Sequence, residues 1–290
     1  MKLSTRSSVL LLALALMSAP AGLRALPDSE AKVGRDLVKR CADSIVGVEM
    51  VVTLKMTMGD RAMPPRENKI DINGTVLNSA GLTVTSLGAI DPRTQLEAMR
   101  GMMAAGGRLE ISDTDYKEVK LRLVDGTEVP ARVVLKDGDL DLAFIAPDPA
   151  AGKREFTSVK LDDAAEGVVL NNYFIVSRAP KALQRVPLVR PSLVAGIVEK
   201  PRRMYLLTDQ QLGCPVFDQQ GRVLGVSVQN LSGGRSSGLV VLPAADVAEI
   251  AKQAAAEAER PPAPKPATET PAPEKKPDTP PAAEPAARIP

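Results

Sequence analysis

The sequence predicts an all-β protein built from antiparallel hairpins. Two apolar runs, Cys214–Phe217 and Arg222–Val228, flank the polar segment Asp218–Gly221, whose glycine accepts the positive φ that hairpin turns require. Two more pairs of apolar runs, within Ile72–Ser86 and Glu118–Leu135, are each divided by a short polar turn. Only 2% of the residues are aromatic and Trp is absent. The core is therefore expected to be aliphatic, which suits strands packed inside small barrels.

The remaining strands are expected at shorter apolar runs. These runs are Ser44–Leu54, Leu140–Ile145, Val168–Val176, Pro187–Glu199, Met204–Thr208 and Gly238–Pro243. Between them we expect a long loop at Lys55–Lys69, where Met, Pro and charged residues mix, and a Gly/Ser loop at Leu231–Ser237. Pro147–Ala165 is expected to connect two groups of strands.

Short helices are predicted at the two ends of this array. Ser29–Cys41 has apolar residues on one face and an acidic first turn, and Ala244–Glu259 places Val247 and Ile250 on one face. Asp91–Gly107 carries the start and stop signals of a helical insertion, with Asp and Pro at its beginning and two glycines at its end.

The N-terminal segment Met1–Ala25 has the pattern of a secretory signal. A basic start is followed by the apolar run Val9–Met17 and then by small residues, so cleavage is expected after Ala21 or after Ala25. The run is too short to span a bilayer. The alternative is an uncleaved signal that tethers the protein, and no later segment is apolar enough to span. We therefore expect an exported protein, periplasmic or extracellular, in which a disulfide could persist.

The C-terminal segment Arg260–Pro290 is rich in Pro, Ala, Lys and Glu, which predicts a disordered tail with polyproline II character. It is expected to be a spacer, or alternatively to contact the cell wall or a partner that binds proline. The net charge of +2 and the scarcity of aromatics argue against nucleic-acid binding, because there is neither a basic face nor a stacking surface.

Several motifs occur in an order and spacing that resemble trypsin-like proteases of the HtrA/Deg type. They are Gly74–Thr85, Leu140–Ile145, Val194–Val198, Thr208-Asp209, Pro215–Val226 and Gly238–Pro243. The resemblance implies two packed six-stranded antiparallel β-barrels with short flanking helices. The double-barrel domain would span residues 29–259, with a first barrel over about 44–146, a second over about 166–243 and the closing helix over 244–259. No room is seen for the PDZ domain that such proteases usually carry.

The resemblance also implies positions for a catalytic triad, and two of the three positions lack the residue type that catalysis needs. Gly88 lies at the position of the family's histidine, and Leu212 lies at the position of its nucleophilic serine. Asp141 corresponds to the family's aspartate and is the same residue type. The chain contains no histidine at all, so a general base would have to be a lysine or a carboxylate. We expect Asp141 to accept hydrogen bonds from neighbouring backbone N–H groups instead. A serine–lysine dyad that uses Ser86 is an alternative.

The two cysteines, Cys41 and Cys214, are expected to be isolated thiols, with a disulfide as the alternative. A shifted register would place Cys214 at the nucleophile position, as in viral relatives of the fold, but Pro215 follows it and no histidine is present to form an ion pair with a thiolate. No cofactor is expected. Met56 and Met58 are weak candidates for a Cu(I) site, and methionine also suits adaptable partner surfaces or plain packing.

These observations predict an exported peptidase-fold protein that binds protein or extended peptide without cleaving it, in the cell envelope. One alternative is a serine endopeptidase with an unrecognised base. Another is a structural envelope component that the Pro-rich tail tethers.

Overall fold

The structure is a computed structural model, and it describes residues 26–58, 61–93, 109–232 and 235–261. The predicted signal, the helical insertion beyond residue 93 and nearly all of the predicted tail lie outside these residues. The elements in the described part run in the order α1 (Asp28–Cys41), β1 (Ile45–Met58), β2 (Arg61–Ala62), β3 (Arg66–Val76), β4 (Thr83–Ser86), α2 (Leu87–Ile90), β5 (Leu109–Arg122), β6 (Glu128–Asp137), β7 (Leu142–Pro147), β8 (Asn172–Arg178), β9 (Pro187–Val198), β10 (Met204–Leu207), β11 (Pro215–Phe217), β12 (Val223–Ser232), β13 (Arg235–Pro243) and α4 (Ala244–Glu259). Single 3₁₀ turns lie at Ala42–Ser44, Pro149–Ala151 and Lys181–Leu183.

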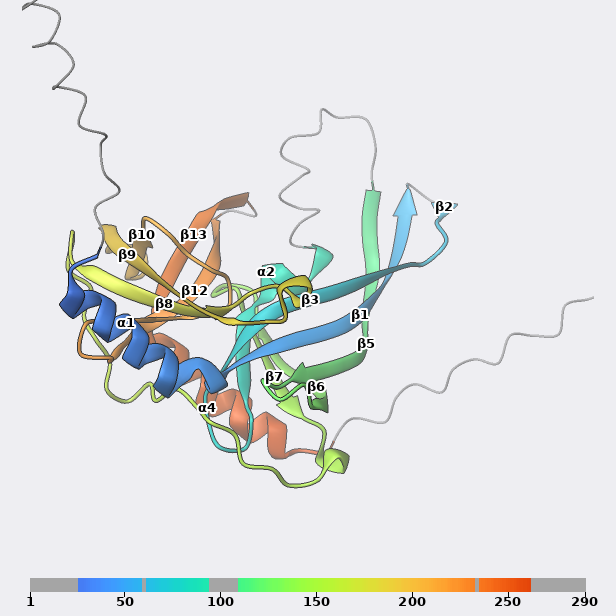
Figure 1. The fold of residues 1–290 in the computed structure, drawn as a ribbon. Coiled ribbons are helices and arrows are strands. Elements are labelled where there is room, and N and C mark those ends of the chain that lie inside the picture. The colour runs from blue at the N-terminus through green and yellow to red at the C-terminus, as the bar shows by residue number, and fades with distance from the viewer. Residues whose placement is uncertain (1–25, 59–60, 94–108, 233–234, 262–290) are drawn as a thin grey trace, which may run out of the picture. The chain divides into compact units, whose positions relative to one another are not determined.

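The first sheet is a closed antiparallel barrel with a short extra strand. Its order is β2-β1-β3-β4-β7-β6-β5, and the pairing of β1 with β5 joins the ends of a six-stranded ring. β2 pairs only with the end of β1. Three strands, β1, β3 and β5, extend together beyond the ring as a long arm (Figure 1).

The second sheet is a closed barrel of six strands in the order β10-β13-β12-β11-β8-β9, and every pairing in it is antiparallel. The predicted hairpin after Cys214 is present as β11 and β12, with a turn closed by Gly221, whose φ is +82°. The predicted all-β fold of two packed six-stranded antiparallel barrels is therefore confirmed.

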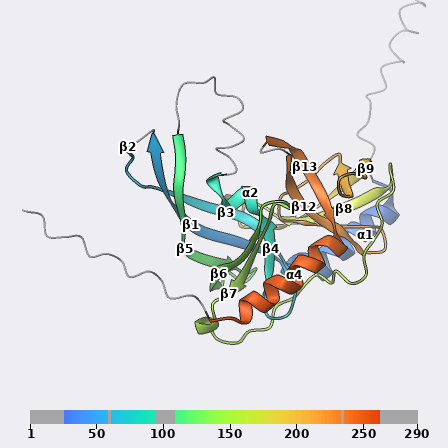
Figure 2. The same ribbon diagram turned by 180° about the vertical axis from the view of Figure 1, so that it is seen from behind.

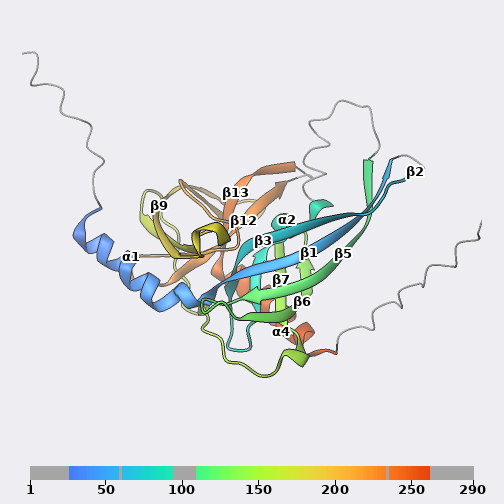
Figure 3. The same ribbon diagram turned by 45° about the vertical axis from the view of Figure 1, so that its right-hand side comes forward.

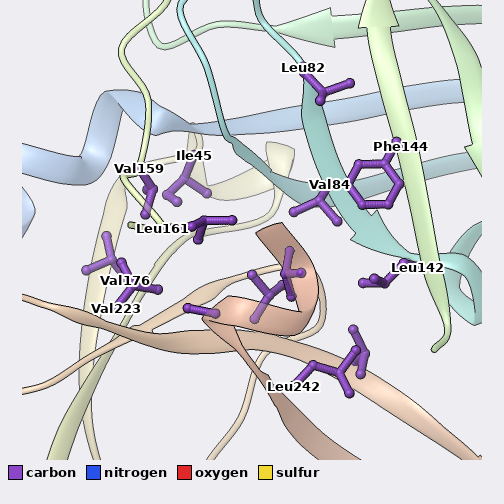
Figure 4. Close-up of a cluster of buried hydrophobic side chains, with 14 of the residues drawn as sticks. Ile45, Leu82, Val84, Leu142, Phe144, Val159, Leu161, Val176, Val223 and Leu242 are labelled. Atoms are coloured by element: carbon purple, nitrogen blue, oxygen red, sulfur yellow. The ribbon is translucent and has the colours of Figure 1, made fainter. Parts of the chain in front are cut away.

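One apolar core joins the two barrels. It contains Leu142 and Phe144 from β7, Val226 from β12 and Leu242 from β13, all buried (Figure 4). α4 packs against β12 of the second barrel and β6 of the first, and adds Val247 to this core (Figure 2). α1 packs against β8 and β9, on the outside of the second barrel (Figure 3).

The expected loops are shorter than predicted. Lys55–Lys69 is not a long loop, because β1 continues to Met58 and β3 begins at Arg66. Pairing with β5 holds Lys55–Met58 as strand, and pairing with β1 holds Arg66–Lys69, despite the polar composition of this stretch. Leu231–Ser237 is likewise not a loop, since β12 continues to Ser232 and β13 begins at Arg235.

Two strand boundaries also differ from the prediction. The strand expected at Val168 begins only at Asn172, because the chain makes a turn first, with Asn171 donating its N–H to the carbonyl of Val168. β5 begins at Leu109, well before the expected Glu118, because β1 pairs with it along its whole length. The helices, in contrast, are close to the predicted ranges: α1 begins one residue early and α4 has the predicted bounds.

Candidate functional site

Asp141 is the central residue of the junction between the two barrels. It lies just before β7 with a φ of +56° and is 1% exposed. Its carboxylate accepts the backbone N–H of Gly88 at 2.6 Å, the backbone N–H of Gln229 at 2.7 Å and the hydroxyl of Ser86. The expected backbone hydrogen bonds are thus confirmed, and they tie β4 and α2 of the first barrel to β12 of the second.

The electrostatic state of Asp141 reflects two opposing effects. Burial raises the pKa of its carboxyl group, while the Ser86 hydroxyl and the N–H groups of Gln229 and Gly88 lower it. Burial is the larger effect, so the pKa lies above the ordinary value of an aspartic acid.

Gly88 is brought next to Asp141, as the triad resemblance implies for that position. It lies in the short helix α2, is buried and contributes only its N–H. Ser86, at the end of β4, is fully buried, and its hydroxyl donates to Asp141. The structure therefore pairs Ser86 with a carboxylate and not with a lysine.

Leu212 lies in the loop between β10 and β11. The hydrogen bonds of Gly213 in this loop are made with Thr75 and Ser227 and not with Asp141. The carbonyl of Gly213 accepts the hydroxyl of Thr75 at 2.7 Å, and the N–H of Gly213 donates to the carbonyl of Ser227 at 2.8 Å. Gly213 has a φ of +71°, and a Cβ there would lie 2.4 Å from the carbonyl oxygen of Asn73. The loop therefore lies directly against β3, and only glycine fits at that contact.

Both cysteines are free thiols, as expected. Cys214 immediately precedes β11 and is completely buried in the apolar core of the second barrel. Burial raises the pKa of the Cys214 thiol far above its ordinary value, which disfavours the thiolate that a nucleophile needs. Cys41 ends α1, and burial raises the pKa of its thiol as well.

The two methionines considered as copper ligands differ in their surroundings. Met56 is buried in the apolar core of the first barrel, whereas Met58, at the end of β1, is 54% exposed. Among the described residues, no group of three or more His, Cys, Asp or Glu side chains is placed to hold a metal ion.

Arg178 is a buried charged residue that sequence reasoning did not single out. Its guanidinium donates to the carbonyls of Ala42 and Ile45, each at 2.5 Å, and to the carbonyl of Arg185 at 3.2 Å. Burial lowers the pKa of this guanidinium, and the nearby carboxylate of Asp43 raises it. Arg178 therefore fixes the end of β8 to the segment that enters β1.

A second arginine in the same loop reaches the first barrel. One nitrogen of Arg185 lies 2.6 Å from a carboxylate oxygen of Glu49 on β1 and 2.6 Å from one of Asp71 on β3. The Arg185 side chain crosses β1 at Gly47, where a Cβ added to the glycine would lie 2.6 Å from another nitrogen of the Arg185 guanidinium. We call residues 178–187 the arginine loop. It covers part of the first barrel.

A cavity of about 420 Å³ adjoins the junction. Buried apolar side chains of Leu140, Val228, Val240 and Leu242 line it, together with the half-buried Met204. The exposed residues Asp139 and Arg202 also border it, and Gln229 connects it to Asp141. The arrangement can accept an apolar side chain between two charged groups of opposite sign.

Two closed antiparallel barrels with a buried aspartate at their junction define the architecture of trypsin-like peptidases. The family model described as "Trypsin-like peptidase domain" matches residues 73–226, and the chain belongs to this family. A search among curated proteins gives no match. Among solved structures, the chain is similar to the MamO protease domain from Magnetospirillum magneticum in its apo form. The TM-score is 0.45 and the identity 16%, over 73% of this chain and 97% of that chain.

Sequence reasoning found Asp141 and its neighbour Gly88 but missed most of their surroundings. Ser86 was considered only with a lysine partner, and nothing in the sequence pointed to Gln229, which is 88 residues away from Asp141. Arg178 carried one usable signal, since it is the charged residue that ends a strand with the apolar middle Tyr173–Val176. In the described part of the chain, no helix has the length and apolar character needed to cross a membrane.

Proposed function

We propose that this chain is an exported, non-catalytic member of the trypsin-like family, of the HtrA/Deg type, that binds protein or extended peptide in the cell envelope. The observation that carries the proposal is the hydrogen bonding of Asp141. Three groups of the chain itself donate to its carboxylate, in a protein whose sequence has no histidine. An orienting carboxylate without a base to orient has no part in acyl transfer.

The Leu212 loop supports the same conclusion. Leucine has no atom that could attack a carbonyl. Serine acyl transfer at this position therefore lacks its nucleophile, and the absence of histidine from the sequence removes its usual base.

Binding is supported by the cavity next to Gln229. Its apolar lining suits one side chain of an extended peptide, and Asp139 and Arg202 would contact the polar groups that flank it.

Incubating the purified chain with unfolded casein and a fluorophosphonate probe tests this proposal. We expect casein to bind but to stay intact, with no serine labelled. The double variant Asp139→Lys, Arg202→Glu should bind casein more weakly, and the exposed Lys153→Glu, outside this cavity, serves as control. Cleavage and labelling that both disappear when one serine is replaced would establish an endopeptidase and overturn the proposal.

The structural alternative is tested by location. The proposed export predicts that the protein is found in the cell envelope or the medium. If removal of residues 260–290 releases it from the envelope fraction while casein binding is unchanged, the tail is the tether and the barrels are the binding module. If casein binding is absent in both forms, the peptide-binding role is wrong.

A further inference from the structure

A turn of three aliphatic residues projects from the second barrel, away from the junction. Val168, Val169 and Leu170 are 51%, 45% and 73% exposed, and they directly precede β8. We call these residues the apolar turn. The exposure of three consecutive large aliphatic side chains needs an explanation, since single exposed apolar residues are common but contiguous ones mark interaction sites.

The backbone of the apolar turn is held firmly. The N–H of Leu170 donates to the carbonyl of Val194 at 2.9 Å, and the N–H of Asn171 donates to the carbonyl of Val168 at 3.1 Å. The N–H of Val168 donates to the hydroxyl of Tyr173 at 2.9 Å. These donors are satisfied inside the protein, so the turn can leave water without losing their hydrogen bonds.

Leu170 has an unusual conformation for its residue type. Its φ of +66° lies in the left-handed region, which glycine and asparagine adopt at lower cost. A strained backbone that holds a leucine in solvent points to a role for the exposed side chain, because the protein gains no packing from it.

The apolar turn lies beside the start of the described chain. The side-chain amide of Asn172 donates to Glu30, in the first turn of α1, at 2.8 Å. Leu26, two residues before α1, is also exposed, at 40%. Figures 1 and 2 both show the loop that enters β8 next to the beginning of α1. In the sequence, residues 1–25, which contain the apolar run Val9–Met17, come directly before Leu26.

We propose that the apolar turn is a docking surface for a lipid bilayer and inserts shallowly into its interfacial region. The turn offers only aliphatic side chains, the N–H groups of Val168 and Leu170 are bonded within the protein, and the turn lies where the export segment of the sequence ends. Two acidic residues lie close to the turn: Glu30 is bonded to Asn172, and Glu166 comes two residues before Val168 in the sequence. Attraction to anionic lipids is therefore not expected to drive binding. This proposal does not depend on the peptide-binding role of the junction.

The test places an environment-sensitive fluorophore on the turn. Val169→Cys in the full chain is labelled with a nitrobenzoxadiazole thiol reagent and mixed with phosphatidylcholine vesicles. Leu183→Cys is the matched control, because Leu183 is 63% exposed and follows the opposite end of β8. The unsubstituted chain, treated with the same reagent, measures the background from Cys41.

We expect the label at residue 169 to shift to shorter wavelength with vesicles, and the label at residue 183 to stay unchanged. Adding phosphatidylglycerol should not strengthen the shift, and Leu170→Asp in the Val169→Cys chain should abolish it while circular dichroism stays the same. No shift at residue 169 would overturn the proposal, whether or not the chain sediments with the vesicles. A shift at both positions, or one without vesicles that grows with protein concentration, would also overturn it, the latter in favour of a second copy of the chain.

Discussion

At Asp141 the protein keeps a carboxylate in its interior and supplies every donor to it from the chain. The left-handed φ, the near-complete burial and the bonds to Ser86, Gly88 and Gln229 make this residue a connector of the two barrels. Its pKa lies above the ordinary value because burial outweighs the donors. A group whose pKa is raised by folding stabilises the protein most at low pH, and this contribution is lost as the pH rises through the folded-state pKa.

Asp141→Asn tests this assignment. We expect the variant to lower the free energy of unfolding by about 1–3 kcal/mol at low pH. The reason is that the amide NH₂ of asparagine would face a donor of the protein, whereas an oxygen of the aspartic acid can accept a hydrogen bond from that donor. The deficit should shrink as the pH rises, since the variant has no charge to bury. Denaturant titrations at a series of pH values measure it, with the exposed Asp139→Asn as control. A deficit that grows with pH would show that the ionised form is the one the fold favours.

The helices and the short hairpins are the elements that local sequence patterns predict well. In α1 and α4, the apolar spacing and the flanking residues mark the ends to within one residue. The extended arm of β1, β3 and β5 is different, because its strands pair along lengths that neither composition nor alternation indicates. The arginine loop belongs to this second class, since its conformation depends on carbonyls and carboxylates far away in the chain.

Arg178→Lys tests the arginine loop. An ammonium group cannot reproduce the fork that reaches Ala42, Ile45 and Arg185 together, so buried carbonyls lose their donors. We expect the free energy of unfolding to fall by about 2–4 kcal/mol in guanidinium titrations and hydrogen exchange in residues 179–187 to speed up. Arg203→Lys, whose side chain forms exposed ion pairs, should change little. Unchanged stability in Arg178→Lys would mean that the other contacts of the loop, including the ion pairs of Arg185, hold it without Arg178.

At the scale of the whole molecule, the two barrels are not independent. Phe144 of β7 lies in the same core as Val226 of β12 and Val247 of α4. Removing a side chain from this core should therefore weaken both barrels at once, although each barrel closes its own ring of backbone hydrogen bonds.

Phe144→Ala tests the shared core. We expect a loss of about 3–5 kcal/mol in the free energy of unfolding, because a large buried ring is replaced by a cavity. Differential scanning calorimetry should show a single transition at lower temperature. The exposed Val124→Ala should leave the transition in place. Two separate transitions, with only one displaced, would show that the barrels unfold separately.

The sequence by itself determined the aliphatic character of the core, the antiparallel hairpins and the two terminal helices, which follow from residue types and short spacings along the chain. The double barrel was implied by the resemblance of several motifs to trypsin-like proteases, and the chain contains no histidine. Only the tertiary structure decided which groups bind Asp141, how the arginine loop crosses β1 and which apolar side chains remain exposed at Val168–Leu170. Each of these depends on groups from distant parts of the chain, whose approach is set by packing and hydrogen bonding in three dimensions and leaves no local pattern.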